Sequence, residues 1–299
     1  MKKIYLVFII LLFVFAGCQV KTIKDKDKSV IMCSTEVIDD LVRAVGGDFI
    51  ETSLAIKSGN DPHSYSATER DIIRITDSSL IVYNGGGLEG RLEWALSKIG
   101  NITPAVSIIK NIPEDKLIYK DKVLNPHIWH DAMLWKSVAT FIADNLVKMN
   151  EENKQVYYQN EEIVLYTLTA LDKYIKEQVA LIPKEKRVLV TEHDAFAYFG
   201  KAYGFETLSI QGISTYSEVS SIDINELADI LIEKNVDTIF LEATVPARNI
   251  KLLQSTLKAR GHFVKIGGTL YADTLGHNNT YDKMMRHNID TIVSALSNK

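Results

Sequence analysis

The chain has 299 residues, of which 46% are hydrophobic and 24% charged, and its formal net charge is −4. If the amino-terminal signal peptide described below is removed, about 280 residues remain. That length is enough for two modest domains around separate cores. No basic stripe runs along this slightly acidic chain, which argues against a nucleic-acid-binding protein.

The amino terminus has the features of a secretory signal. Two lysines precede an uninterrupted apolar run over residues 4–16, which is too short to span a membrane. The run ends in Ala-Gly-Cys, and this ending resembles the lipobox of bacterial lipoproteins. We therefore predict a signal peptide over residues 1–17 and acylation of Cys18; the alternative is ordinary secretion with cleavage near Gly17.

Residues 18–28 are polar and charged, and they predict a flexible tether between a lipid anchor and the folded body. Beyond Cys18, Cys33 is the one remaining cysteine of the chain. A single thiol excludes an internal disulfide and a thiolate metal cage. Because Cys33 lies in an apolar run, we expect it to be a small buried side chain.

Strands and helices alternate with short links over residues 29–150, which predicts a first α/β lobe. Such alternation implies a parallel sheet with right-handed crossovers. The predicted strands are residues 30–36, 49–56 and 80–85, and the predicted helices are residues 37–47, 67–79 and 88–100, with a further helix that begins after Asp131.

Residues 151–182 contain neither glycine nor proline, and Pro183 ends the run. They predict one linking helix of about 45 Å at ~1.5 Å per residue, long enough to act as a stiff spine across two lobes. We expect its apolar face to consist of Val156, Ile163, Tyr166, Ala170, Tyr174 and Leu181.

Alternation resumes over residues 183–299 and predicts a second α/β lobe. The predicted strands are residues 187–192, 207–211, 238–243 and 262–268, with helices at 194–204, 223–235 and 247–261. The expected fold class is thus α/β, with two lobes that each contain a parallel sheet flanked by helices and that are joined by one long rigid helix.

Four predicted loops combine a turn-prone backbone with a side chain that can bind a metal. In parallel sheets, ligands bind where strands pass into loops at their carboxyl ends. Three imidazoles and one carboxylate from such loops would form a closed site for a divalent ion. A lone loop histidine is nevertheless most often solvated or hydrogen-bonded. The candidates are His63 in "GNDPHSY", His127 in "NPHIWHD", His193 in "TEHDAF" and Asp273 in "GGTLYADTLG".

The stretch "LNPHIWHD" holds two histidines, His127 and His130, three residues apart. Pro126 argues against a helix through them, so we expect their side chains to point in different directions. Glu192 could serve as a general base beside His193, but we expect it to face the other side of its strand. Structural or surface roles are expected for the other histidines, His262, His277 and His287.

Six segments together resemble one known family, the zinc- and manganese-binding solute-binding lipoproteins of ABC importers, of the TroA/ZnuA type. The resemblance covers essentially the whole mature chain in order, through "GNDPHSYSATERDI", "NPHIWHD", "TEHDAFAYFGKAYGFE", "QGISTYSEVS", "TIFLEATVPAR" and "GGTLYADTLG" with its continuation "TYDKMMRHNIDTI". It implies two α/β lobes joined by one long helix, with the metal between the lobes. It also implies that Zn²⁺ or Mn²⁺ is bound by four ligands, namely His63, His127 (rather than His130), His193 and Asp273.

The function implied by this resemblance is not enzymatic. It is high-affinity capture of Zn²⁺ or Mn²⁺ outside the cytoplasm and delivery to a membrane ABC permease with its cytoplasmic ATPase. We expect a monomer anchored by lipid to the bacterial cell membrane. The loop over residues 110–125 contains no histidine, whereas many zinc-dedicated relatives carry a histidine-rich acidic loop there, so a zinc-only protein is disfavoured.

Two other functions compete with metal delivery. A surface adhesin or structural lipoprotein would act in cell adhesion, but no segment of the sequence indicates a receptor-binding surface. A zinc hydrolase would need an open coordination position and a nearby base. A coordinated Asp273 would close that position, and the chain contains no HExxH stretch.

Overall fold

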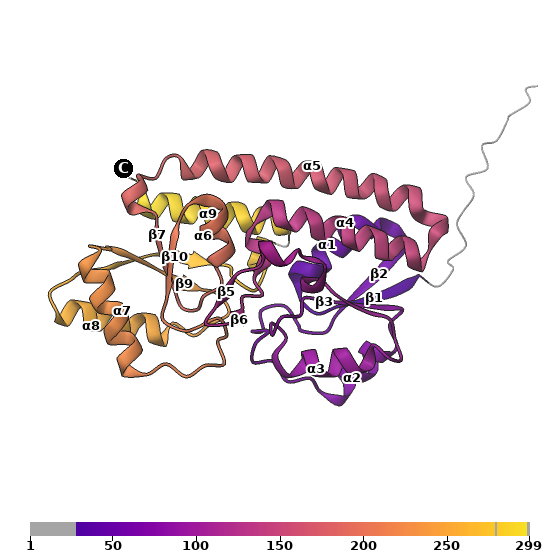
Figure 1. Cartoon of the computed structure of the whole chain (residues 1–299), viewed down its shortest axis with the longest axis horizontal. Coiled ribbons are helices and arrows are strands. Elements are labelled where there is room, and N and C mark those ends of the chain that lie inside the picture. Colours follow the sequence, from indigo (N-terminus) through magenta and orange to yellow (C-terminus); the bar gives the residue numbers. More distant parts are fainter. Residues whose placement is uncertain (1–27, 279, 298–299) are drawn as a thin grey trace, which may run out of the picture.

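The computed structural model describes residues 28–278 and 280–297. The predicted signal peptide and the predicted acylation site Cys18 lie outside the described residues. Within the described part, no helix combines the length and the apolar character that a membrane span requires. Figure 1 shows two groups of strands, with helix α5 (Lys154–Val179) running above both of them.

The N-terminal lobe, defined as the elements that precede α5, is built on a parallel sheet with strand order β2-β1-β3-β4. Its central strand β1 ends in fully buried residues, and Cys33 is one of them, as predicted. The strands are β1 (Ser29–Cys33), β2 (Ile50–Leu54), β3 (Leu80–Tyr83), β4 (Ala105–Ser107) and an antiparallel pair, β5 (Tyr119–Lys120) and β6 (Val123–Leu124). The helices are α1 (Glu36–Gly46), α2 (Glu69–Thr76), α3 (Gly90–Ile99) and α4 (Ala132–Met149).

Helix α4 begins where the sequence predicted. The carboxylate of Asp131 accepts hydrogen bonds from the backbone N–H groups of Met133 and Leu134, which caps the first turn. Immediately before this cap, the short 3₁₀ turn Ile128–His130 leads the chain out of the loop that carries His127. The cap and the turn together fix the orientation of that loop relative to α4.

Helix α5 is continuous over 26 residues, but it is shorter than the predicted range 151–182, because a 3₁₀ turn (Glu151–Asn153) precedes it and the helix ends at Val179. Its predicted apolar face is largely wrong, since four of the six residues are exposed. Ile163 is 65% exposed, Tyr166 is 78% exposed, and Leu181 just beyond the helix is 59% exposed. The reason is that the buried stripe also contains the polar residues Glu161 and Asp172, so hydrophobicity alone selected the wrong face. Glu161 accepts a hydrogen bond from Thr140, and Asp172 pairs with Lys176. The buried apolar residues of the helix are Tyr157, Leu168, Leu171, Ile175 and Val179.

The C-terminal lobe, defined as the elements that follow α5, contains two parallel strand pairs, β7–β8 and β9–β10, with β7 beside β9. The last strand begins three residues later than predicted, because residues 262–264 form the link from the preceding helix. The strands are β7 (Val188–Thr191), β8 (Glu206–Ser209), β9 (Thr238–Glu242) and β10 (Lys265–Leu270). The helices are α6 (Ala197–Tyr203), α7 (Ser221–Glu233), α8 (Arg248–Ala259) and α9 (Tyr281–Leu296).

The two lobes share one apolar core, so the expectation of separate cores is wrong. A single buried cluster includes Val42 of α1, Leu171 of α5, Phe199 of α6 and Ile289 of α9. It is continuous because α5 packs against helices of both lobes and α9 returns from the C-terminal lobe to lie beneath α5 (Figure 1). Smaller clusters fill the outer part of each lobe. The lobes are therefore joined by packed side chains as well as by the linking helix.

Candidate metal centre

All four candidate residues meet between the lobes. His63 lies in the loop after β2, His127 in the loop before α4, His193 just after β7, and Asp273 just after β10. Three of these loops thus follow the carboxyl end of a parallel strand, where the sequence argument expected them. Each residue offers one possible ligand atom, these atoms lie within 4.8 Å of one another, and all four residues are buried.

The spacing of the converging atoms suits a small divalent ion. Nε2 of His127 lies 3.1 Å from Nε2 of His63 and 3.3 Å from Nε2 of His193. The Asp273 carboxylate lies 3.3 Å from Nε2 of His193 and 3.5 Å from Nε2 of His127. Ligand atoms about 2.0–2.1 Å from a tetrahedral zinc ion are about 3.3–3.4 Å apart. These four distances therefore match the edges of a four-coordinate site.

The carboxylate of Asp273 supports the same interpretation. Both of its oxygens are buried, and neither receives a hydrogen bond of ordinary geometry. A buried carboxylate without donors is costly unless a cation compensates it. Its pKa would be raised by burial, but the imidazoles of His193, His127 and His63 hold that pKa well below its ordinary value. The cluster thus contains one anionic oxygen ligand at neutral pH.

The three histidines differ in their protonation. Burial lowers the pKa of His63 and lowers the pKa of His127 further, so both keep free nitrogen lone pairs at neutral pH. Burial alone would also lower the pKa of His193. The carboxylates of Glu242 and Asp273 outweigh that effect and raise the pKa of His193 well above its ordinary value. A metal ion that binds Nε2 of His193 must therefore displace a proton.

Glu242, at the end of β9, supports His193, and the sequence did not indicate it. One carboxylate oxygen accepts the backbone N–H of His193 at 2.8 Å, and the other accepts Nδ1–H of its ring at 2.5 Å. With Nδ1 engaged in this way, Nε2 points into the cluster, which is the usual role of an outer carboxylate at a metal site. Glu242 is 49 residues from His193, and no local motif connects them.

The other two histidines have local supports that the sequence does signal. Asp61 accepts the backbone N–H of His63 at 2.9 Å. Asn125 accepts the backbone N–H of His127 at 3.1 Å and lies 2.8 Å from its Nδ1. In both "DPH" and "NPH" the supporting side chain lies two residues before the histidine, a spacing typical of turns that Asp and Asn stabilise. The repeated spacing could have identified both residues.

His130 is not part of the cluster, as expected, and it has a structural role. It is fully buried, it packs on Phe196 with ring centroids 4.4 Å apart, and burial lowers its pKa to about 3. Its Nε2 donates to the carbonyl of Ala272 at 3.1 Å, and Nε1 of Trp129 donates to the same carbonyl at 2.9 Å. Because Ala272 precedes Asp273, both side chains hold the loop that carries the carboxylate.

The remaining candidates lie outside the cluster. Glu192 is buried and is not among the clustered residues; burial and the neighbouring Glu242 raise its pKa to about 7. His262 contacts the carbonyl of Val236, His287 contacts the carbonyl of Thr269, and His277 is exposed.

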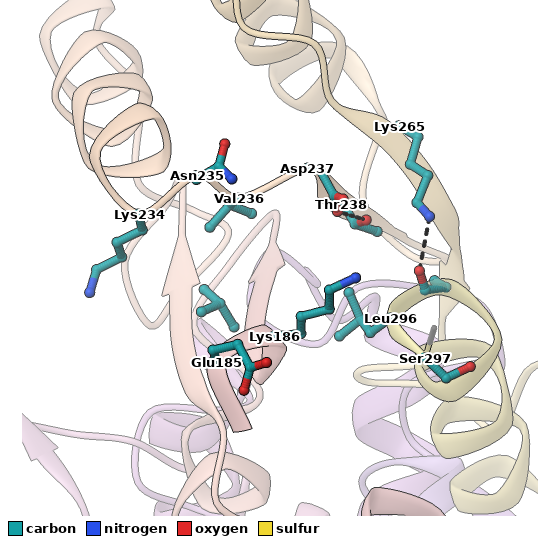
Figure 2. Close-up of a pocket in the computed structure, with 12 residues that line it drawn as sticks. Glu185, Lys186, Lys234, Asn235, Val236, Asp237, Thr238, Lys265, Leu296 and Ser297 are labelled. Atoms are coloured by element: carbon teal, nitrogen blue, oxygen red, sulfur yellow. Dashed lines mark hydrogen bonds between the residues drawn. The ribbon is translucent and has the colours of Figure 1, made fainter. Parts of the chain in front are cut away.

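One cavity borders the cluster, and a larger cavity lies elsewhere on the molecule. The first, of about 300 Å³, is lined by His63 and by residues of both lobes. The larger one, of about 590 Å³, lies at the amino-terminal edge of the C-terminal strands, and none of the four cluster residues lines it. Figure 2 shows several polar side chains around this larger cavity. Lys265 donates a hydrogen bond to the carbonyl of Ala295 at 3.0 Å. The larger cavity is not part of the candidate centre.

Comparison with known proteins agrees with this geometry. The family model "ZnuA: Zinc-uptake complex component A periplasmic" matches residues 31–295. The chain belongs to this family. Members of this family are solute-binding proteins and not enzymes, so the prediction of a non-enzymatic protein is confirmed.

Its relatives match over most of their length. The manganese-binding lipoprotein MntA of Bacillus subtilis (strain 168) is 35% identical over 292 residues, which cover 95% of each chain. The zinc-binding protein TroA of Treponema pallidum (strain Nichols) is 35% identical over 275 residues, 90% of this chain and 89% of TroA. The solved structure of TroA superposes with a TM-score of 0.88 at 34% identity, and the alignment covers 91% of this chain and all of that structure. The two-lobed α/β fold with a long linking helix is thus confirmed.

Proposed function

We propose that this protein binds a divalent transition metal ion, Zn²⁺ or Mn²⁺, outside the cytoplasm and delivers it to an ABC importer. The observation that carries the proposal is the buried convergence of three imidazole nitrogens and one carboxylate within 4.8 Å of one another. Its relatives MntA and TroA are named for manganese and zinc binding, and MntA is also named a lipoprotein.

The four ligands in this proposal are His63, His127, His193 and Asp273. With Asp273 in the fourth position, the ion has no open site for a reactive water, so the centre suits capture rather than hydrolysis. Complete burial of the ligands means that the ion loses its hydration shell on binding. Such a site favours tight and selective binding.

The proposal also covers the rest of the chain. Residues 1–17 are a signal peptide, and residues 18–28 tether the acylated Cys18 to the folded body. Residues 29–150 and 183–299 form two lobes, and residues 151–182 link them. The protein works as a lipid-anchored monomer on the outer face of the cell membrane. There it meets the permease, whose cytoplasmic ATPase drives import.

The experiment that tests this function is a metal titration of the chain without its signal peptide. Elemental analysis after purification without added metal should find about one transition-metal ion per chain, and the metal-stripped protein should bind Zn²⁺ more tightly than Mn²⁺ because imidazole ligands favour zinc. His262→Ala is a suitable control, since His262 lies away from the cluster and contacts Val236. A chain that binds neither ion, or an affinity that falls equally in His262→Ala and His63→Ala, would contradict the proposal.

A further inference from the structure

The cavity beside His63 opens between the two lobes. Its N-terminal wall includes His63, Gly86 and Pro126, and its C-terminal wall includes Gly212, Ile213 and Ser214. Among the four cluster residues, His63 is the one that lines this cavity, and the cavity of about 300 Å³ is large enough to hold a hydrated ion. We name this opening the mouth of the cleft.

Several hydrogen bonds join the lobes around the mouth. Asn125 and Lys120 both donate to Asp194, at 2.7 and 3.4 Å, and the shortest bond joins Thr215 to Asp61. Oγ1 of Thr215, in the loop between β8 and α7, donates to Oδ2 of Asp61 at 2.5 Å. Another contact lies further out, where Nη2 of Arg91 donates to the hydroxyl of Tyr216 at 3.2 Å. Tyr216 is 65% exposed, so water competes with this outer contact, whereas Thr215 and Asp61 are both partly buried.

Asp61 connects this crossing bond to the metal cluster. Its Oδ1 accepts the backbone N–H of His63, and its Oδ2 accepts the hydroxyls of both Ser64 and Thr215. The same carboxylate therefore holds a candidate ligand from the N-terminal lobe and a loop from the C-terminal lobe. Hydrogen bonds to an ionised acceptor are stronger than neutral ones.

The loop that carries Thr215 is itself braced. Nε2 of Gln211 donates to the carbonyl of Thr215 at 3.2 Å and to the carbonyl of Ser217 at 2.8 Å. This bracing holds the loop as a short arch, with Thr215 directed toward Asp61. When the bond between Thr215 and Asp61 breaks, the arch can move away from His63 as a unit.

We propose that the metal ion enters and leaves through the mouth beside His63, and that the Thr215–Asp61 hydrogen bond sets the rate of its release. This inference rests on the proposed metal-binding function. Asp61 and Thr215 are positioning residues in this scheme, because they hold a ligand loop and the opposing arch without touching the ion. Breaking their bond is a required step before the lobes part at the mouth.

Stopped-flow release of Zn²⁺ into an excess of a chromophoric chelator tests the inference. Thr215→Val removes the hydroxyl at nearly constant shape and should raise the dissociation rate by about tenfold or more, in line with the loss of one hydrogen bond to a charged acceptor. Thr215→Ser keeps a hydroxyl and should stay close to the wild-type rate. Ser64→Ala is the matched control, because it removes a hydrogen bond to the same oxygen of Asp61 without breaking a contact between lobes.

Thermal unfolding of the metal-free variants separates release from general destabilisation. We expect Thr215→Val and Ser64→Ala to unfold at similar temperatures while their release rates differ. A Thr215→Val rate within twofold of wild type, or an equal acceleration in Ser64→Ala, would overturn the inference and leave the metal-binding function intact. A wild-type chain that retains no Zn²⁺ would overturn both.

Discussion

The two sides of the junction between the lobes are held by different kinds of contact. At the mouth the contacts are partly or largely exposed, as in the bond from Arg91 to Tyr216. At the opposite side, which we call the back, most of the groups involved are buried. There Trp129 and His130 both donate to the carbonyl of Ala272, and Glu36 of α1 accepts the backbone N–H of Leu275 at 2.7 Å and the hydroxyl of Thr274.

The two sides therefore have different structural roles. A buried hydrogen bond that loses one partner costs about 1–3 kcal/mol, whereas exposed contacts contribute little because water replaces them. The back is also continuous with the shared apolar core. The back therefore fixes the lobes relative to each other, and the mouth is where they can part. Asp273 belongs to the back and His63 to the mouth, so a bound ion would join the two.

The largest expected effect is a difference in Zn²⁺ affinity between variants of two neighbouring histidines. His127 lies in the cluster and His130 lies at the back. His127→Ala should lower Zn²⁺ affinity by more than about 100-fold, because losing even an outer partner of a ligand costs about 10- to 100-fold. His130→Ala should keep the affinity within about tenfold, since Trp129 still holds Ala272, while it lowers the free energy of unfolding by about 1–3 kcal/mol.

Competition titrations and urea unfolding of both variants check this pair. Similar Zn²⁺ affinities for the two variants would show that His127 is not a ligand. If the free energy of unfolding of His130→Ala equalled that of wild type, the contact of His130 with Ala272 would not stabilise the back.

The second prediction concerns protons released from the cluster on metal binding. The pKa of His193 is raised, so its proton must leave when an ion binds, and Zn²⁺ affinity should fall about tenfold for each unit that pH is lowered from 8 to 6.5. The pKa values of His63 and His127 are lowered, so these two begin to compete only below their ordinary value of about 6.5.

Glu242→Gln provides the matched variant, because the carboxylate of Glu242 helps to raise the pKa of His193. Its removal should lower that pKa, reduce the number of protons released at pH 7 and flatten the pH dependence. Calorimetry in two buffers of different protonation enthalpy measures the proton count, with His262→Gln as a control. Equal proton release by wild type and Glu242→Gln would show that Glu242 does not set the protonation of His193.

The third prediction compares stability at the two sides directly. Glu36→Ala removes the acceptor for two groups of the C-terminal lobe and should lower the free energy of unfolding by about 2 kcal/mol. Arg91→Ala at the mouth should change it by less than about 0.5 kcal/mol. Urea unfolding of the two metal-free variants is the measurement. Equal losses would remove the distinction between back and mouth.

Much of this arrangement could be predicted from the sequence, because local rules govern it. His193 and Asp273 follow predicted strands, and the carboxyl ends of parallel strands bring such residues to one edge. The absence of glycine and proline predicted a continuous linking helix. Its buried face could not be predicted from hydrophobicity, because Glu161 and Asp172 lie on that face with polar partners.

Contacts between distant segments were beyond prediction for a different reason. Glu242 and His193 are 49 residues apart, and Glu36 and Leu275 are 239 apart. Neither pair has a characteristic spacing, and each forms only when the fold places two loops together. From the sequence alone, such charged residues are expected at the surface. In the structure, Glu242 orients a candidate ligand and Glu36 joins the lobes.

The smallest expected effect is on the overall shape of the molecule. Helix α5 is unbroken over 26 residues and the back shares a core with both lobes, so a wide hinge motion would have to break packed side chains. Opening at the mouth alone moves a few loops. The radius of gyration, roughly 18 Å for a chain of this length, should therefore change by less than about 0.5 Å when Zn²⁺ binds. Small-angle scattering with and without Zn²⁺ measures this directly. A decrease of about 2 Å or more would show that the lobes swing apart at the back, and it would reverse the roles assigned to the two sides.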